Sequence, residues 1–175
     1  QGSELEILAA VAASIDHLLD KCFGTDRHQR TAYLLRRGAQ PIAGPTMVVR
    51  EHGQIIASVQ YWPVALVNDA GRPYALTLLG PIGVDPDQRG RGIGVELMHK
   101  SLAVADALGC GPVVLIGDVE YYTRFGFSAD ATALWRLPGP VEQHRVLLRN
   151  PGRVNLPKVA RLLACADAYI AAPTV

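Results

Sequence analysis

Residues 80–94 form a glycine-rich corner and read Gly-Pro-Ile-Gly-Val-Asp-Pro-Asp-Gln-Arg-Gly-Arg-Gly-Ile-Gly. The apolar stretch 74–84 predicts a strand that leads into the corner, and residues 92–108 predict an amphipathic helix that leaves it. No Ser, Thr, Asp or Asn lies between Arg89 and Gly94, so the helix has no side-chain cap for its first amides. Unpaired amides, the positive end of a helix dipole and two arginines together favour the binding of a phosphate.

Two common phosphate motifs do not fit this corner. A dinucleotide fingerprint needs the spacing G-x-G-x-x-G, whereas the glycines here are Gly90, Gly92 and Gly94. A nucleoside triphosphate loop needs Gly-Lys-Ser or Gly-Lys-Thr, and neither occurs in the chain. The pattern that does match is [Q/R]-x-x-G-x-[G/A], which Arg89, Gly92 and Gly94 satisfy.

A second motif, Gly-Asp-Val-Glu-Tyr-Tyr-Thr-Arg-Phe-Gly-Phe, occupies residues 117–127. It follows the short apolar run 112–116, which is typical of a buried strand. Residues 119–125 predict a short helix that ends at Gly126, a residue suited to a left-handed conformation. Asp118 precedes this helix and is expected to cap it, with a catalytic role as the alternative.

The two motifs together resemble those of the GNAT superfamily of N-acetyltransferases, over residues 42–137. The resemblance implies that acetyl-CoA is the co-substrate and that Tyr122 is the general acid. It also implies that bare amides and arginines of the corner bind the pyrophosphate, that main chain of the preceding strand pairs with the pantetheine arm, and that an aromatic packs near the coenzyme. The residues expected in these roles are Gly90, Gly92, Ile93 and Gly94 with Arg89 and Arg91; Ile82, Gly83 and Val84; and Phe125.

Acetyl transfer to an amine requires a neutral nitrogen, a polarised carbonyl and a proton for the departing thiolate. Because a tyrosine has an ordinary pKa near 10, the Tyr122 hydroxyl can donate that proton at neutral pH. Glu120, Asp85 and a chain of waters remain open as the general base. The resemblance implies direct attack in a ternary complex. A cysteine acyl-enzyme is not expected, since no cysteine lies in either motif.

The order of predicted elements implies an α/β fold (α+β) with a mixed, mostly antiparallel central sheet and helices on both faces. Pro81 cannot donate a ladder hydrogen bond, so a bulge or splay point is expected at residues 79–81. The whole chain, 1–175, is expected to be one domain with a core at 42–137 and a C-terminal helical extension at about 151–175. The other expected elements are a strand at 4–8, helices at 9–22 and 26–37, a hairpin of 47–50 with 54–66, strands at 133–137 and 145–149, and a helix at 156–170.

The net charge and the positions of the cysteines and histidines limit the partners and cofactors that the sequence predicts. A net charge of +1 gives no reason to expect nucleic acid or an anionic membrane as a partner. The absence of a long apolar run and of a signal peptide predicts a cytoplasmic protein, and three widely spaced cysteines predict reduced thiols. The five histidines show no metal-ligand spacing, so no metal is expected. Edge strands that need cover make a homodimer compatible with this fold.

The acceptor is expected to be a primary amine on a small molecule, with a protein N-terminus or lysine as the alternative. A non-catalytic coenzyme A sensor and a binding module for another nucleotide are rival functions. The segment 26–37 carries Arg27, His28, Arg30, Arg36 and Arg37, which predict a solvated face or, less simply, a wall of the acceptor site. Tyr61 and Trp62 fit either acceptor lining or core packing.

Overall fold

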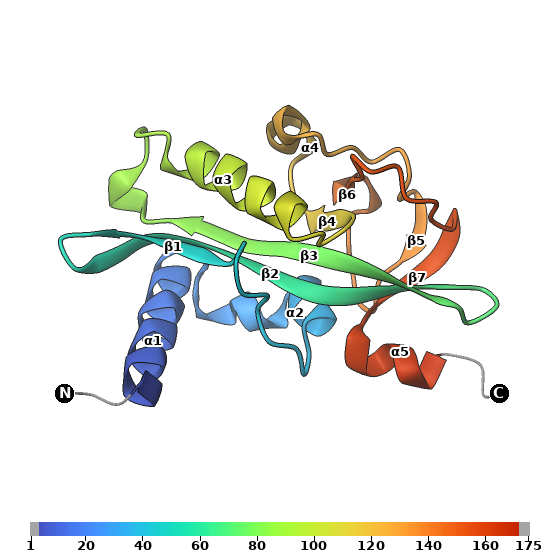
Figure 1. Cartoon of the computed structure of the whole chain (residues 1–175), viewed down its shortest axis with the longest axis horizontal. Coiled ribbons are helices and arrows are strands. Elements are labelled where there is room, and N and C mark those ends of the chain that lie inside the picture. The colour runs from blue at the N-terminus through green and yellow to red at the C-terminus, as the bar shows by residue number, and fades with distance from the viewer. Residues whose placement is uncertain (1–3, 172–175) are drawn as a thin grey trace.

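A seven-stranded mixed sheet forms the middle of the molecule in the computed structural model, which describes residues 4–171 (Figure 1). The strand order is β5-β7-β2-β3-β4-β6, and β1 pairs with β2 outside this path. Among the described strands, β3–β4 and β5–β7 are parallel pairs and the other pairs are antiparallel. The strands are β1 Met47–Glu51, β2 Gln54–Asn68, β3 Pro73–Val84, β4 Val113–Ile116, β5 Leu134–Arg136, β6 Val146–Arg149 and β7 Val159–Ala164.

Helices cover both faces of the sheet, which confirms the predicted fold class. Figure 1 shows α3 and α4 over one face and α1, α2 and α5 over the other. Their bounds are α1 Glu4–Phe23, α2 Thr31–Leu35, α3 Ile93–Ala107, α4 Val119–Tyr122 and α5 Cys165–Ala171. None of these helices is both long enough and apolar enough to cross a lipid bilayer.

The alternating side chains of β2 divide the core into two clusters. Val59 and Tyr61 pack with Leu97 and Met98 of α3, whereas Trp62 belongs to the cluster on the opposite face, with Leu35 of α2. The predicted pairing of the hairpin 47–50 with 54–66 is confirmed, and so are the helix after the glycine corner and the two later strands. Apolar residues recur with clear periodicity within each of these elements. Their tertiary contacts therefore stabilise the conformation that the local sequence already favours.

The expected strand at residues 4–8 is wrong, because α1 begins at Glu4 and continues to Phe23. The alternation Glu-Leu-Glu-Ile over four residues suggested a strand, but Glu, Leu and Ala are all good helix formers. Apolar residues at helical spacing follow without interruption, so the first residues extend the helix that was predicted for 9–22.

The expected helix at 156–170 is wrong over its first half, where β7 pairs with β2 and β5. Ala160, Leu162 and Ala164 point into the core and Arg161 does not, which is the alternation of a strand. Leucine and alanine favour helices, so only the pairing on both sides selects the extended form. The helix α5 starts at Cys165.

The segment 26–37 is not one continuous helix. A short 3₁₀ turn at Thr25–Gln29 is followed by Arg30 in an extended conformation, with φ of −71° and ψ of 147°, and α2 begins at Thr31. This break turns the basic side chains of the segment in more than one direction, which bears directly on the site.

Candidate active site

The glycine corner connects β3 to α3 through a 3₁₀ turn at Pro86–Gln88. Gly90 and Gly92 have φ of +86° and +72°, a region that side chains disfavour, and no heavy atom lies within 4 Å of a Cβ built on either. Gly92 caps α3 without any side-chain hydrogen bond, as predicted. The first amides of α3 are therefore left for an external acceptor, beside open space that a side chain would fill.

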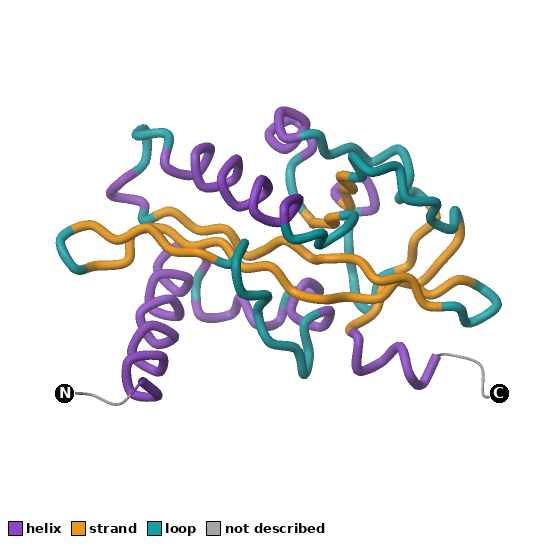
Figure 2. Tube along the Cα trace, in the orientation of Figure 1, coloured by secondary structure: helices purple, strands orange, loops and turns teal. Residues whose placement is uncertain are grey.

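The two arginines of the corner have different surroundings. Arg91 donates to both carboxylate oxygens of Glu51, at 3.1 and 2.8 Å, and to Gln88 Oε1 at 2.6 Å. This pairing raises the pKa of Arg91 and lowers the pKa of Glu51. The contact joins the corner to the β1–β2 turn at one end of the sheet (Figure 2). Arg89 forms no ion pair within the described chain, so its charge is free for a ligand.

The strands β3 and β4 part shortly after they meet. They pair only at Thr77–Val113 and Leu78–Val114, while β4 continues along β6 to Ile116. The predicted bulge is confirmed: Gly80 and Pro81 of β3 lie opposite a single residue of β2, Gln60. The Trp62 indole donates to the Gly80 carbonyl at 2.7 Å and holds the bulge in place.

Beyond the bulge, Ile82, Gly83 and Val84 pair with β2 on one edge only. Helix α1 packs directly on this segment, since a Cβ on Gly83 would lie 3.3 Å from Leu19 Cδ2 and 3.4 Å from Cys22 Sγ. The Cys22 thiol donates to the Val84 carbonyl at 3.3 Å. The other edge of the segment faces the gap between β3 and β4, where main-chain groups remain available for pairing.

A cavity of about 1000 Å³ opens at this gap. Leu79 and Pro81 of β3 and Leu115 of β4 line one part of it. The opposite part is lined by the segment from the end of α1 through α2, including three arginines, and by residues 140–142 with Arg145. Thr31 Oγ1 donates to the Pro140 carbonyl at 2.5 Å and fixes that loop against α2.

Tyr122 and Tyr121 of α4 both line the cavity. Burial raises the pKa of Tyr122 to about 12, with a smaller contribution from Tyr121. The hydroxyl of Tyr121 lies 3.7 Å from a Cβ built on Gly94, so this residue also faces the start of α3. Tyr121 therefore joins the cavity to the N-terminus of α3, a contact that its place beside Tyr122 in the sequence does not reveal.

Four other residues that the sequence analysis named as site candidates pack or cap secondary structure. Asp118 caps α4 by accepting from the Glu120 amide at 3.1 Å, as expected. Phe125 is buried, packs edge-on against Tyr121 at 5.6 Å and does not line the cavity, so its contact with a coenzyme stays a prediction. Tyr61 bonds to Ser101 in the core, and Trp62 is also buried, which supports core packing for both.

The arginines of the 26–37 segment are the site feature that sequence reasoning ranked too low. Arg27, Arg30 and Arg36 line the cavity, so the solvated face that the sequence favoured does not describe them. No group of three or more potential metal ligands occurs among residues 4–171.

Comparison with known protein families agrees with this geometry. Residues 11–129 match the model of the acetyltransferase (GNAT) domain. The chain belongs to the GNAT family. The matched GNAT region includes most of α1, all of α2 and both motifs, so the likeness starts well before residue 42. Membership of this family makes the protein an acetyltransferase.

Among GNAT relatives, the chain is 28% identical over 151 residues to the uncharacterized N-acetyltransferase YhbS of Escherichia coli, covering 86% of this chain and 81% of that protein. The crystal structure of YhbS in complex with CoA has a TM-score of 0.68 at 24% identity, over 91% of this chain and 86% of that one. A GNAT acetyltransferase from Brucella melitensis in complex with acetyl-CoA has a TM-score of 0.64 at 24% identity, over 90% and 91% of the two chains. These structures share the GNAT fold described above.

Proposed function

We propose that this protein transfers the acetyl group of acetyl-CoA to a primary amine of a small molecule by direct attack in a ternary complex. The observation that carries the proposal is that one cavity joins the gap between β3 and β4, the tyrosines of α4 and a part lined by α2 and the arginines around it. We refer to this last part, lined by Arg27, Arg30, Arg36 and Arg145, as the chamber under α2. A thioester in the gap and an amine in the chamber would meet beside Tyr122. Both structures compared above were solved with CoA or acetyl-CoA.

The corner fits the phosphates of the coenzyme. Open space at Gly90 and Gly92 lets phosphate oxygens approach the amides of Gly92, Ile93 and Gly94. Arg89 supplies an unpaired positive charge, and Arg91 adds a second if it exchanges Glu51 for phosphate. The free edge of Ile82, Gly83 and Val84 orients the pantetheine amides in the manner of an added strand.

The coenzyme supplies an activated thioester, and the chain supplies proton transfer and orientation. The Tyr122 hydroxyl donates its proton to the departing sulfur, and the proton lost by the acceptor nitrogen restores it, so protons balance over the cycle. With a pKa of about 12, Tyr122 keeps its proton throughout the neutral range. Burial raises the pKa of the thiols of Cys22, Cys110 and Cys165, which disfavours a cysteine acyl-enzyme.

The test is the release of coenzyme A thiol from acetyl-CoA in the presence of a panel of primary amines. Tyr122→Phe should lower turnover by roughly 10²-fold or more, the usual effect of losing a general acid, with unchanged affinity for coenzyme A by calorimetry. Wild-type protein that binds coenzyme A but acetylates no amine would instead support a sensor. Protein that gives no heat with coenzyme A would contradict the proposed function altogether.

A further inference from the structure

The cavity is lined by more basic than acidic side chains. Four arginines line the cavity, namely Arg27, Arg30, Arg36 and Arg145, against two carboxylates. Of those two, Asp118 caps α4 and Glu142 lies 3.4 Å from His144 on the surface. A site that receives only a protonated amine would gain nothing from such a concentration of positive charge.

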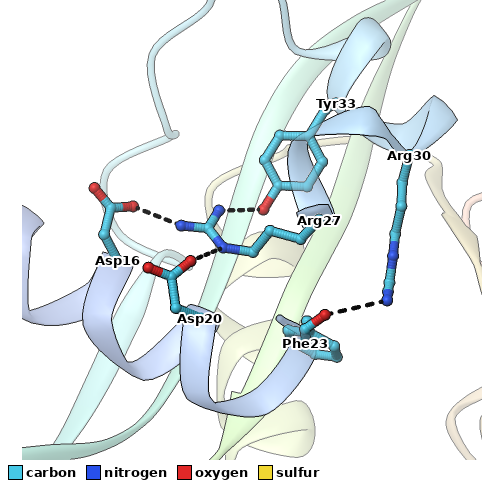
Figure 3. Close-up of polar contacts among 6 residues, drawn as sticks. All are labelled: Asp16, Asp20, Phe23, Arg27, Arg30 and Tyr33. Atoms are coloured by element: carbon cyan, nitrogen blue, oxygen red, sulfur yellow. Dashed lines mark hydrogen bonds and ion pairs between the residues drawn. The ribbon is translucent and has the colours of Figure 1, made fainter. Parts of the chain in front are cut away.

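Arg27 is a structural member of this group. Its side chain is 2% exposed, and its guanidinium donates to Asp20 at 3.0 Å, Asp16 at 3.2 Å and the Tyr33 hydroxyl at 2.6 Å (Figure 3). Figure 3 also shows that Arg30 does not join this cluster of Arg27 with Asp16 and Asp20, but points toward the carbonyl of Phe23. The charge of Arg27 is thus matched by two carboxylates of α1, and it ties α1 to α2.

Arg36 is not matched in this way. Its guanidinium carbon lies 3.7 Å from the ring centroid of Tyr33 and 4.4 Å from that of Trp62, so the group is fixed between two aromatic rings. Tyr33 hydrogen-bonds to this guanidinium, and the charge of Asp16 acts on it from a distance. The Nη1 atom, however, is buried without a hydrogen-bond partner, and no carboxylate within residues 4–171 forms an ion pair with Arg36. A buried N–H donor of a cation is costly to leave unpaired, which favours binding of an acceptor at this group.

A planar anion meets the geometry of this group. A guanidinium offers parallel N–H donors that match the two oxygens of a carboxylate, and the stacking rings hold it in a fixed plane. Arg30 and Arg145, which form no ion pair within the described residues, add positive charge around the same chamber. Nearby cations also disfavour the protonated form of an amine, which helps the acceptor nitrogen to become a nucleophile.

We propose that the acceptor is a small amine that also carries a carboxylate, and that Arg36 binds this carboxylate. The proposal rests on the proposed function, because it names the substrate class of the same site. Arg36 is a specificity-determining residue in this account, and the amine of the acceptor reaches the gap between β3 and β4 while its carboxylate stays under α2.

The experiment compares amino acids with their carboxamides as acceptors, using glycine, β-alanine, L-leucine, L-phenylalanine and 6-aminohexanoate. Wild-type kcat/KM should favour at least one carboxylate over its amide by tenfold or more. Arg36→Gln should lower kcat/KM for that carboxylate by roughly 10- to 100-fold and leave its amide nearly unchanged. Arg37→Gln is the matched control, since Arg37 is exposed, lies outside the cavity and pairs with Asp167.

A binding measurement separates the two proposals. The N-acetyl derivatives of the same amino acids, and their amides, are titrated calorimetrically into the protein saturated with coenzyme A. Carboxylates that bind wild type and not Arg36→Gln support the anion site even if no amine is acetylated. Equal turnover of acids and amides, or acids that bind no better than amides to wild type, overturns the carboxylate while leaving acetyl transfer intact. If Arg36→Gln unfolds, Arg36→Lys and the wild-type comparison still decide.

Discussion

The ring of Tyr122 lies directly against the backbone of Gly117. A Cβ atom built on Gly117 would be 2.5 Å from Tyr122 Cε2 and 3.2 Å from Leu115 Cδ1. Tyr121 and Phe127 flank the same ring, at centroid distances of 4.9 and 6.1 Å. The ring therefore has little room to retreat, and the position of the proposed proton donor depends on the absence of a side chain at residue 117.

We expect Gly117→Ala to lower kcat by roughly tenfold or more, because displacement of a catalytic group by about 1 Å costs up to 10²-fold. Affinity for coenzyme A, measured by calorimetry, should change much less. Gly152→Ala is the control, since no heavy atom lies within 4 Å of a Cβ there. Unchanged turnover in a folded Gly117→Ala protein would argue against Tyr122 as the acid.

The pH dependence of turnover should reflect the high pKa of Tyr122. Because burial raises that pKa to about 12, the proton-donating form persists up to and beyond pH 10. The rate should rise with pH as the acceptor amine loses its proton and then stay level to pH 10. A fall in kcat centred near pH 10, the ordinary tyrosine pKa, would show that the hydroxyl titrates without the effect of burial. Stopped assays over pH 6–10.5 with saturating acetyl-CoA measure this.

Both motifs could be predicted from the sequence because their information is local. The positive φ angles at Gly90 and Gly92 follow from glycine in a tight corner, and the cap at Asp118 follows from one residue and its neighbours. The splay at Pro81 was predictable because proline cannot continue a ladder. The backbone features that depend on a few adjacent residues thus agree with the sequence, whereas the binding and catalytic roles of these residues stay predictions.

For the arginines of segment 26–37, the sequence could not decide between a solvated face and a cavity wall, because the contacts that decide are not local. Arginines at helical spacing look the same whether they face solvent or a cavity. The break at Arg30, the contact of Thr31 with Pro140 and the stacking of Arg36 between Tyr33 and Trp62 all depend on the folded chain. The same holds for β7, which the sequence alone could not distinguish from a helix until its pairing with β2 was known.

Alanine at Gly92 should weaken coenzyme binding in excess of its effect on stability. At φ of +72°, an alanine costs about 1 kcal/mol of backbone strain, and its Cβ enters the space where phosphate is proposed to bind. Gly109→Ala provides a matched control at the other end of α3, with φ of +69° and no neighbour within 4 Å. Both variants should lose similar stability in thermal melts, and only Gly92→Ala should bind coenzyme A more weakly. Equal affinities would remove Gly92 from the phosphate site.

Asp106 of α3 and Arg149 of β6 should give a stability contribution that depends on pH. Two hydrogen bonds of 2.8 Å from Arg149 lower the pKa of Asp106. A lowered folded pKa means that the pair stabilises the protein above the unfolded aspartate pKa, near 3.9, and that the contribution disappears as pH falls through the folded value. Since Asp106 is 42% exposed, solvent screening limits the contribution to about 1 kcal/mol at pH 7.

Denaturant melts of Asp106→Asn from pH 7 down to pH 3 measure this contribution. The difference from wild type should shrink toward the acid end. Glu96→Gln, which breaks an exposed pair with Lys100 on the same helix, should have a smaller effect at pH 7. A difference between wild type and Asp106→Asn that is constant with pH would assign the effect to packing instead of charge.

Arg89 and Arg91 should contribute unequally to coenzyme binding, although they are two residues apart. Arg91 already shares its charge with Glu51 at 2.8 Å, so a phosphate must compete with that carboxylate, whereas Arg89 has no such partner among the described residues. We therefore expect Arg89→Gln to weaken coenzyme A binding roughly tenfold and Arg91→Gln only two- to threefold. Glu51→Gln should strengthen binding slightly by freeing Arg91, and this gain should vanish in the double variant with Arg91→Gln. Calorimetric titrations at low and high salt measure wild type and all four variants. A larger loss for Arg91→Gln than for Arg89→Gln would mean that the pair with Glu51 opens fully when the coenzyme binds.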